Sequence, residues 1–141
     1  MKLLRHLTPA GPAYAALQPG GTALEITGDP LAGTHRVTDR VVTPGKLLAP
    51  VAPSTIICIG LNYAKHAAEG GKGPPERPVW FMKLPGAVQN PGDPIVLPAH
   101  QPTEKADYEA ELALVLGREC RNATRENALS FVLGYTCAND V

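Results

Sequence analysis

Short apolar runs separated by proline, glycine and polar residues dominate the chain from about residue 53 onward, and their lengths are typical of strands. Residues 55–60 form a continuous apolar run of the kind found in buried strands. The run 93–98 carries a proline at each end, which favours a position at the edge of a sheet. The strands predicted in this part of the chain are residues 55–60, 79–83, 93–98, 108–116 and 134–138.

Two helices are predicted between these strands. Asn62 can cap a short helix that ends at Glu69, because an asparagine side chain accepts hydrogen bonds from the first amide groups of a helix. Thr124 can cap a second helix over residues 125–133, whose apolar side chains recur at spacings of three and four. Gly134 would end that helix.

The first fifty residues read as short strands joined by turns. Residues 23–27 follow the turn signal Pro19-Gly20-Gly21 and predict one of these strands. The 15 prolines and 14 glycines make up about a fifth of the chain, against a usual share of about 12%. We therefore expect residues 1–52 to form a small β-rich leader and residues 53–141 to form part of a second domain.

Composition and charge exclude several classes of protein. The 13 basic and 13 acidic side chains balance, so neither nucleic acid nor an anionic membrane is an expected partner. No apolar run approaches the ~20 residues that cross a bilayer, and Arg5 interrupts any signal-peptide core. The three cysteines are odd in number and lack metal-ligand spacing, which predicts reduced thiols in a cytoplasmic protein. Cys58 and Cys137 lie in apolar runs and are expected in the core.

The most informative polar pattern is the recurrence of Asp107, Glu109 and Glu111 at a spacing of two. Side chains alternate between the faces of a strand, so these acids would share one face. Neighbouring carboxylates repel each other unless a divalent cation binds between them. Hard oxygen ligands with no nearby cysteine or histidine favour Mg²⁺, Mn²⁺ or Ca²⁺ over Zn²⁺. The alternative is an edge strand whose acids face water.

A further acid, Asp140, follows the predicted strand 134–138. At the end of that strand, its carboxylate could complete a three-carboxylate metal site with Glu109 and Glu111. The three remaining positions of an octahedral cation would hold water and a bidentate 2-oxo carboxylate, which a cation polarises as a Lewis acid.

His66 and Glu69 are spaced as neighbours on one helical face. A carboxylate beside an imidazole fixes its tautomer, which suits a general base; the alternative is a surface ion pair worth roughly a few tenths of a kcal/mol. Lys83 could face a substrate carboxylate, pair with an acid or project into water. Tyr63 could pack under the helix or reach the pocket. The other histidines have no acid partner at a useful spacing and are expected at the surface: His6, His35 and His100.

Taken in order, four sequence blocks resemble the fumarylacetoacetate hydrolase family. The blocks are residues 59–63 with His66 and Glu69, residues 78–83, residues 107–112, and residues 134–136 with 139–141. The resemblance implies a mainly β fold with short helices (α+β), a mixed β-sandwich roll of the fumarylacetoacetate hydrolase C-terminal-domain type. Residues 53–141 would be the N-terminal part of that catalytic domain.

The resemblance also implies site roles. Metal ligation falls on Glu109, Glu111 and Asp140, with Asp107 in a supporting role at most, and the expected cation is Mg²⁺, or Mn²⁺ or Ca²⁺ in its place. His66 is expected to activate water and Glu69 to orient it. The substrate-binding residues are expected to be Lys83 and Tyr63.

The implied reaction is hydrolytic C–C bond cleavage of an acylpyruvate or a fumarylacetoacetate-like diketo acid, or decarboxylation, through a metal-bound enolate. A small 2-oxo carboxylate substrate, a homodimer and a role in the catabolism of aromatic compounds go with it. Two other interpretations stay open: an isomerase of the 2-hydroxyhepta-2,4-diene-1,7-dioate type, and a non-catalytic metal-binding subunit. Because family members continue well beyond the Asn-Asp pair, we expect this chain to be a fragment or to pair with a separate C-terminal half.

Overall fold

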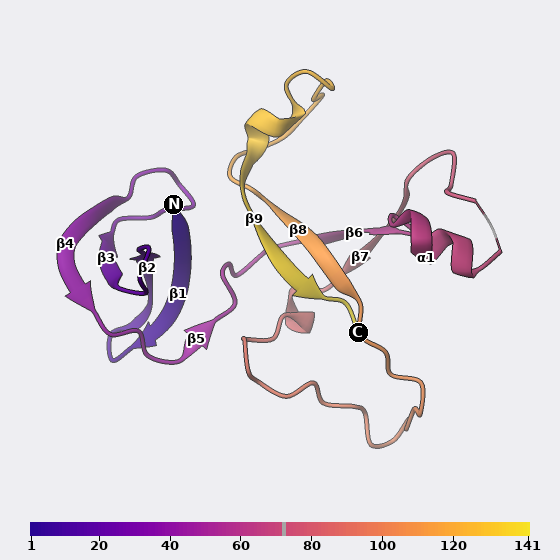
Figure 1. Cartoon of the computed structure of the whole chain (residues 1–141), viewed down its shortest axis with the longest axis horizontal. Coiled ribbons are helices and arrows are strands. Elements are labelled where there is room, and N and C mark those ends of the chain that lie inside the picture. The colour runs from indigo at the N-terminus through magenta and orange to yellow at the C-terminus, as the bar shows by residue number, and fades with distance from the viewer. Residues whose placement is uncertain (72) are drawn as a thin grey trace. The chain divides into compact units, whose positions relative to one another are not determined.

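The computed structural model describes residues 1–71 and 73–141 and is mainly β (Figure 1). Its elements, in chain order, are β1 Lys2–Thr8, β2 Gly11–Leu17, β3 Ala23–Thr27, β4 Arg36–Val42, β5 Leu47–Leu48, β6 Ile56–Gly60, α1 Ala64–Glu69, β7 Val79–Lys83, the 3₁₀ helix η1 Pro85–Ala87, β8 Ala110–Leu116, the 3₁₀ helix η2 Ala128–Phe131 and β9 Val132–Asn139. Strands with a few short helices confirm the predicted fold class. No helix of the described residues is long and apolar enough to cross a membrane.

The chain divides into two compact units, which we describe separately. One unit comprises Met1–Pro50 with Asn90–Val141, and the other comprises Val51–Gln89. The division into residues 1–52 and 53–141, made on sequence blocks, stays a prediction.

The N-terminal residues form a five-stranded antiparallel sheet in the order β4-β3-β2-β1-β5. The small core of this unit includes Ala15, Ala16, Ala23 and Ile26, from β2 and β3 in the middle of the sheet. Alanine at three of these positions leaves little side-chain volume between the curled strands (Figure 1, indigo to purple). The predicted strand 23–27 is therefore confirmed as the inner strand β3.

His6 on β1 is buried, with 5% of its surface exposed, so its expected surface position is wrong. Its Nδ1 accepts a hydrogen bond of 3.2 Å from the backbone N–H of Gly45. Gly45 lies so close to the carbonyl group of Leu7 that a β-carbon would overlap it. The segment before β5 therefore packs against His6. These positions are too far apart in sequence for a local pattern to predict the contact.

A polar turn after residue 89 is hydrogen-bonded to the end of this sheet. Asn90 Oδ1 accepts a 3.0 Å hydrogen bond from the N–H of Ala49, and its amide donates to Asp93 at 3.0 Å. Lys46 Nζ lies 2.7 Å from the Asp93 carboxylate. These hydrogen bonds from Lys46 and Asn90 lower the pKa of Asp93 below its ordinary value of 3.8. The predicted strand 93–98 does not form, because its first side chain serves this turn and its prolines lack the N–H that a sheet requires.

The second unit is built on the antiparallel pair β6–β7, which confirms the strands predicted at 55–60 and 79–83. Helix α1 follows β6 and ends at Glu69 as predicted. Its N-cap is Tyr63 in an extended conformation, with no side-chain hydrogen bond, so the predicted cap at Asn62 is wrong.

Strands β8 and β9 form a two-stranded antiparallel ribbon (Figure 1, orange and yellow). The helix predicted over residues 125–133 is wrong: only the four-residue η2 forms, and β9 already begins at Val132. Val132 pairs with Leu116, so tertiary strand pairing overrides the helical spacing. Gly134 lies within β9, opposite Val115, and does not end a helix.

The cysteines and the leucines of β8 are partly or largely exposed. The three cysteines are not paired in disulfides in the structure. Cys137 is exposed and Cys58 is half-buried, so the predicted core position is wrong for Cys137. The leucines on the same face of β8, Leu112, Leu114 and Leu116, are more than half exposed.

Candidate functional site

The register of β8 and β9 brings the three predicted metal ligands to one face of the ribbon. Glu111 pairs with Ala138, and the backbone N–H of Asp140 donates a 2.9 Å hydrogen bond to the carbonyl oxygen of Glu109. Glu109 therefore lies opposite Asp140 at the open end of the ribbon. Residues that face each other across an antiparallel pair, and those two apart along one strand, share a face. Glu109 and Asp140 lie one residue beyond the paired strands and continue the ladder through this hydrogen bond, so strand alternation predicts that Glu109, Glu111 and Asp140 project from the same side.

The donor set suits a hard divalent cation, although the side chains are not gathered around a common point. Among the described residues, no three His, Cys, Asp or Glu side chains lie close enough together to hold a metal ion. Glu109 is exposed, and Glu111 and Asp140 are half-buried. Because the backbone already places the three carboxylates on one face, rotation about side-chain torsions is the movement that would gather them. The face and the ligand type fit Mg²⁺, Mn²⁺ or Ca²⁺.

Asp107 precedes β8, which begins at Ala110. Its Oδ1 accepts a 2.8 Å hydrogen bond from the N–H of the next residue, Tyr108. The strand therefore does not fix which way Asp107 faces, and a supporting role for it stays a prediction.

His66 and Glu69 meet on α1 as their spacing predicts. His66 Nδ1 lies 3.6 Å from Glu69 Oε2, and the two side chains are 52% and 76% exposed. This distance is longer than a hydrogen bond, so the contact is electrostatic. A carboxylate next to Nδ1 favours a proton on that nitrogen and leaves the lone pair on Nε2. The contact is present; the chemical role of the pair stays a prediction.

The two predicted substrate-binding residues lie in the same unit as His66. The carbonyl of Tyr63 accepts a 3.0 Å hydrogen bond from the N–H of Ala67 in the first turn of α1, and the residue is 41% exposed. Lys83 ends β7, pairs with Ile56 and is half-buried. The structure thus places His66, Glu69, Tyr63 and Lys83 in the unit Val51–Gln89 and the three metal-ligand candidates in the other unit.

Asn139 is a residue of the site whose role the sequence does not reveal. Its Oδ1 accepts a 2.9 Å hydrogen bond from the backbone N–H of Glu109, 30 positions earlier in the chain. The sequence shows only an asparagine directly before Asp140. The partner of Asn139 follows from strand register, which no local pattern determines.

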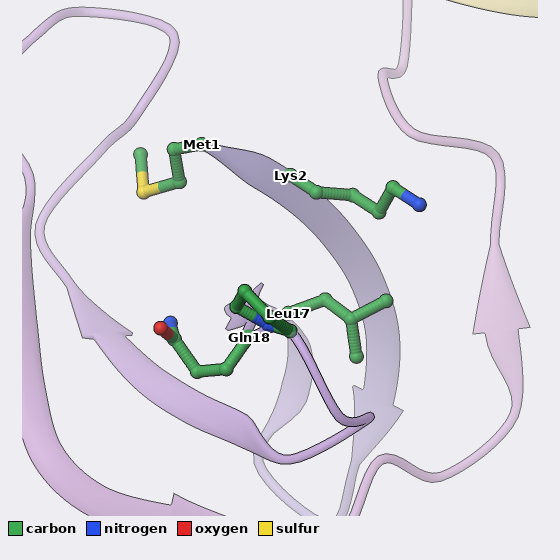
Figure 2. Close-up of a pocket in the computed structure, with 5 residues that line it drawn as sticks. Met1, Lys2, Leu17 and Gln18 are labelled. Atoms are coloured by element: carbon green, nitrogen blue, oxygen red, sulfur yellow. The ribbon is translucent and has the colours of Figure 1, made fainter.

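A hollow of about 550 Å³ lies elsewhere, on the N-terminal sheet where Lys2 of β1 pairs with Leu17 of β2 (Figure 2). The described residues that line it are Met1, Lys2, Leu17, Gln18 and Pro19. These side chains include no carboxylate, imidazole or thiol, so the hollow offers no candidate for the predicted chemistry.

Two family models match the chain. Residues 55–141 match the fumarylacetoacetate (FAA) hydrolase C-terminal domain, and residues 1–50 match the Rv2993c-like N-terminal domain. The first match covers more than half of the chain. The chain therefore belongs to the fumarylacetoacetate hydrolase family, which confirms the resemblance seen in the sequence blocks.

Three relatives illustrate the range of the family. Protein Rv2993c of Mycobacterium tuberculosis is 40% identical over 100% of this chain and 55% of its own length. Caffeoylpyruvate hydrolase of Neonothopanus nambi is 37% identical over 86% of this chain and 42% of its own. The crystal structure of 2-hydroxyhepta-2,4-diene-1,7-dioate isomerase from Mycobacterium marinum has a TM-score of 0.78 and 36% identity, over 99% of this chain and 54% of that one.

The chain spans about half the length of the curated relatives that it matches, or less. Two of the three relatives carry enzyme names, one a hydrolase and the other an isomerase. The family is therefore one of enzymes whose members catalyse different reactions.

Proposed function

We propose that the protein is a divalent-metal-dependent enzyme that hydrolyses a C–C bond in a 2-oxo or diketo carboxylate of the acylpyruvate or fumarylacetoacetate type. The observation that supports this proposal is the strand register, which sets Glu109 opposite Asp140 and two residues from Glu111 at the same end of the β8–β9 ribbon. The relative named caffeoylpyruvate hydrolase supports an acylpyruvate as substrate.

The three carboxylates would hold the cation, which is Mg²⁺ or, in its place, Mn²⁺ or Ca²⁺. When bound, the cation supplies Lewis-acid chemistry: it draws electron density from the 2-oxo carboxylate and stabilises the negative charge that develops as the C–C bond breaks. The protein's own contribution would be to present three anionic oxygens that hold the cation from one face of the ribbon.

The proposed proton acceptor is His66. With Glu69 beside Nδ1, the lone pair of the neutral imidazole lies on Nε2, which would take a proton from the water that adds to the carbonyl carbon of the scissile C–C bond. The imidazolium would then return this proton to the carbon that is released when the bond breaks. Glu69 acts as an orienting group, because its carboxylate favours the tautomer with the proton on Nδ1. Lys83 and Tyr63 are proposed to bind the substrate, the ammonium group through charge and the phenol through a hydrogen bond.

An isomerase of the 2-hydroxyhepta-2,4-diene-1,7-dioate type is the second candidate, since the enzyme of that name from Mycobacterium marinum is 36% identical. It would use the same three carboxylates but no attacking water. Decarboxylation would likewise need the cation and no water.

Product analysis separates these reactions. The full-length protein containing this chain would be incubated with an acylpyruvate and Mg²⁺, with a matched sample containing excess chelator. We expect pyruvate and a second carboxylic acid to form with Mg²⁺ and not in the sample with excess chelator. A single rearranged product, or loss of carbon dioxide, would assign one of the other reactions, and turnover that is unchanged by chelator would refute the role of the metal.

A further inference from the structure

The β8–β9 ladder ends in an irregular way next to the candidate metal ligands. Its last paired residues are Ala110 and Asn139. Beyond them, the N–H of Asp140 donates to the carbonyl of Glu109 at 2.9 Å, as in a continuing ladder. The N–H of Glu109, however, donates to the side-chain Oδ1 of Asn139, also at 2.9 Å.

Both backbone polar groups of Glu109 are therefore held by the end of β9. In a regular antiparallel pair, opposing residues bond only through their main chains. Here a carboxamide supplies an acceptor at the point where the strand would otherwise fray. Local opening at the end of a strand costs little free energy. An added hydrogen bond there therefore limits the movement of the Glu109 backbone.

The chemical nature of Asn139 suits this position. A carboxamide oxygen accepts the Glu109 N–H without adding a negative charge beside Glu109, Glu111 and Asp140. Because Asn139 pairs with Ala110, its side chain starts on the face opposite the carboxylates. It can therefore hold the backbone without occupying the space where the three acids would meet a cation.

We propose that Asn139 is a positioning residue that fixes the backbone of Glu109, so that Glu109 and Asp140 present their carboxylates to the same cation. This inference rests on the proposed function, because it assigns Asn139 a task at the same metal site. Asn139 does not touch the substrate or the cation; it acts through Glu109. Residues that orient metal ligands typically change metal affinity by about 10–100-fold when they are removed.

The test is a Mn²⁺ titration followed by electron paramagnetic resonance, which distinguishes free from bound Mn²⁺, on the full-length protein containing this chain. Asn139→Ala removes the acceptor, and Asn139→Asp keeps an oxygen in the same place. The matched control is Asn127→Ala, because Asn127 Oδ1 accepts a 2.8 Å hydrogen bond from the N–H of Thr124 in the ribbon loop, well away from the acids in sequence. We expect Asn139→Ala to weaken Mn²⁺ binding about tenfold or more, while Asn139→Asp and Asn127→Ala bind at least as tightly as the parent protein.

Amide hydrogen exchange provides a readout that does not depend on metal. The Glu109 amide should exchange faster in Asn139→Ala than in the parent protein and stay protected in Asn139→Asp. Unchanged exchange in Asn139→Ala would show that the hydrogen bond does not form in solution and would overturn the inference.

The metal titration separates the two proposals. If the parent protein binds Mn²⁺ and Asn139→Ala binds it equally well, the positioning role is wrong and the proposed function stands. If the parent protein binds no Mn²⁺, the metal site itself is wrong, and the positioning role is wrong with it.

Discussion

Individual side chains carry the candidate chemistry, and backbone geometry decides which of them share a face. Glu111 reaches its face by strand alternation, whereas Asp140 reaches it by pairing with Glu109 across the ribbon. His66 meets Glu69 through the spacing of a single helix. The helical contact was predictable from the sequence because it is local, and the alignment across the ribbon required the register.

Replacing the proposed base tests its role at this scale. We expect His66→Ala to slow metal-dependent cleavage by about 10²–10⁴-fold, because water would lose its proton acceptor, while Mn²⁺ affinity stays unchanged. His100→Ala is the control, since His100 is also exposed and has no assigned role. Steady-state kinetics and a metal titration on each variant provide the measurement. Full activity in His66→Ala would remove this residue from the mechanism.

Secondary-structure elements differ in how well the sequence predicts them. β6, β7 and α1 were predicted within one or two residues, since apolar runs bounded by turns determine them locally. The helix expected over residues 125–133 was wrong because Val132 pairs with Leu116 instead. The strand expected at 93–98 was wrong because Asp93 serves a polar turn. In both cases a partner distant in sequence decided the outcome.

The segment before β5 packs closely against β1, so a larger side chain at Gly45 should destabilise the fold. Gly45→Ala should lower the free energy of unfolding by about 1–3 kcal/mol, because the added β-carbon overlaps the Leu7 carbonyl. Gly86→Ala is the matched control, since no described atom lies within 4 Å of its added β-carbon. Denaturant unfolding of both variants would show the difference, and equal stability of the two would contradict the close approach.

The turn at Asn90 and Asp93 predicts a pH dependence. Lys46 and Asn90 lower the pKa of Asp93 in the folded protein, so this carboxylate contributes stability above its ordinary pKa of 3.8 and loses it as the pH falls through the lower folded value. Asp93→Asn should therefore show a smaller loss of stability than the parent protein between about pH 5 and about pH 2.

Thermal unfolding across that pH range provides the measurement, with Asp39→Asn as control because Asp39 is an exposed acid on β4. We expect the control to follow the parent protein. If Asp93→Asn and the parent protein lose stability in parallel, the Lys46–Asp93 pair does not contribute in solution.

For the whole molecule, the family was predictable from the sequence because four short blocks occur in a characteristic order. The site residues in those blocks fall into two compact units, with His66 in one and the carboxylates in the other. Features that depend on contacts across the chain were not predictable, including the burial of His6 beneath Gly45 and the hydrogen bond from Glu109 to Asn139. The chain itself accounts for about half the length of its relatives.

The proposed enzyme depends on a divalent cation bound by three carboxylates at the end of the β8–β9 ribbon. Calorimetric titration of the full-length protein with Mg²⁺ tests it most directly, alongside Glu111→Gln and the control Glu119→Gln, which alters an exposed acid in the ribbon loop. We expect one Mg²⁺ per protein chain, with affinity about tenfold or more lower in Glu111→Gln and unchanged in Glu119→Gln. Absence of Mg²⁺ binding by the parent protein, or equal binding by Glu111→Gln, would contradict it.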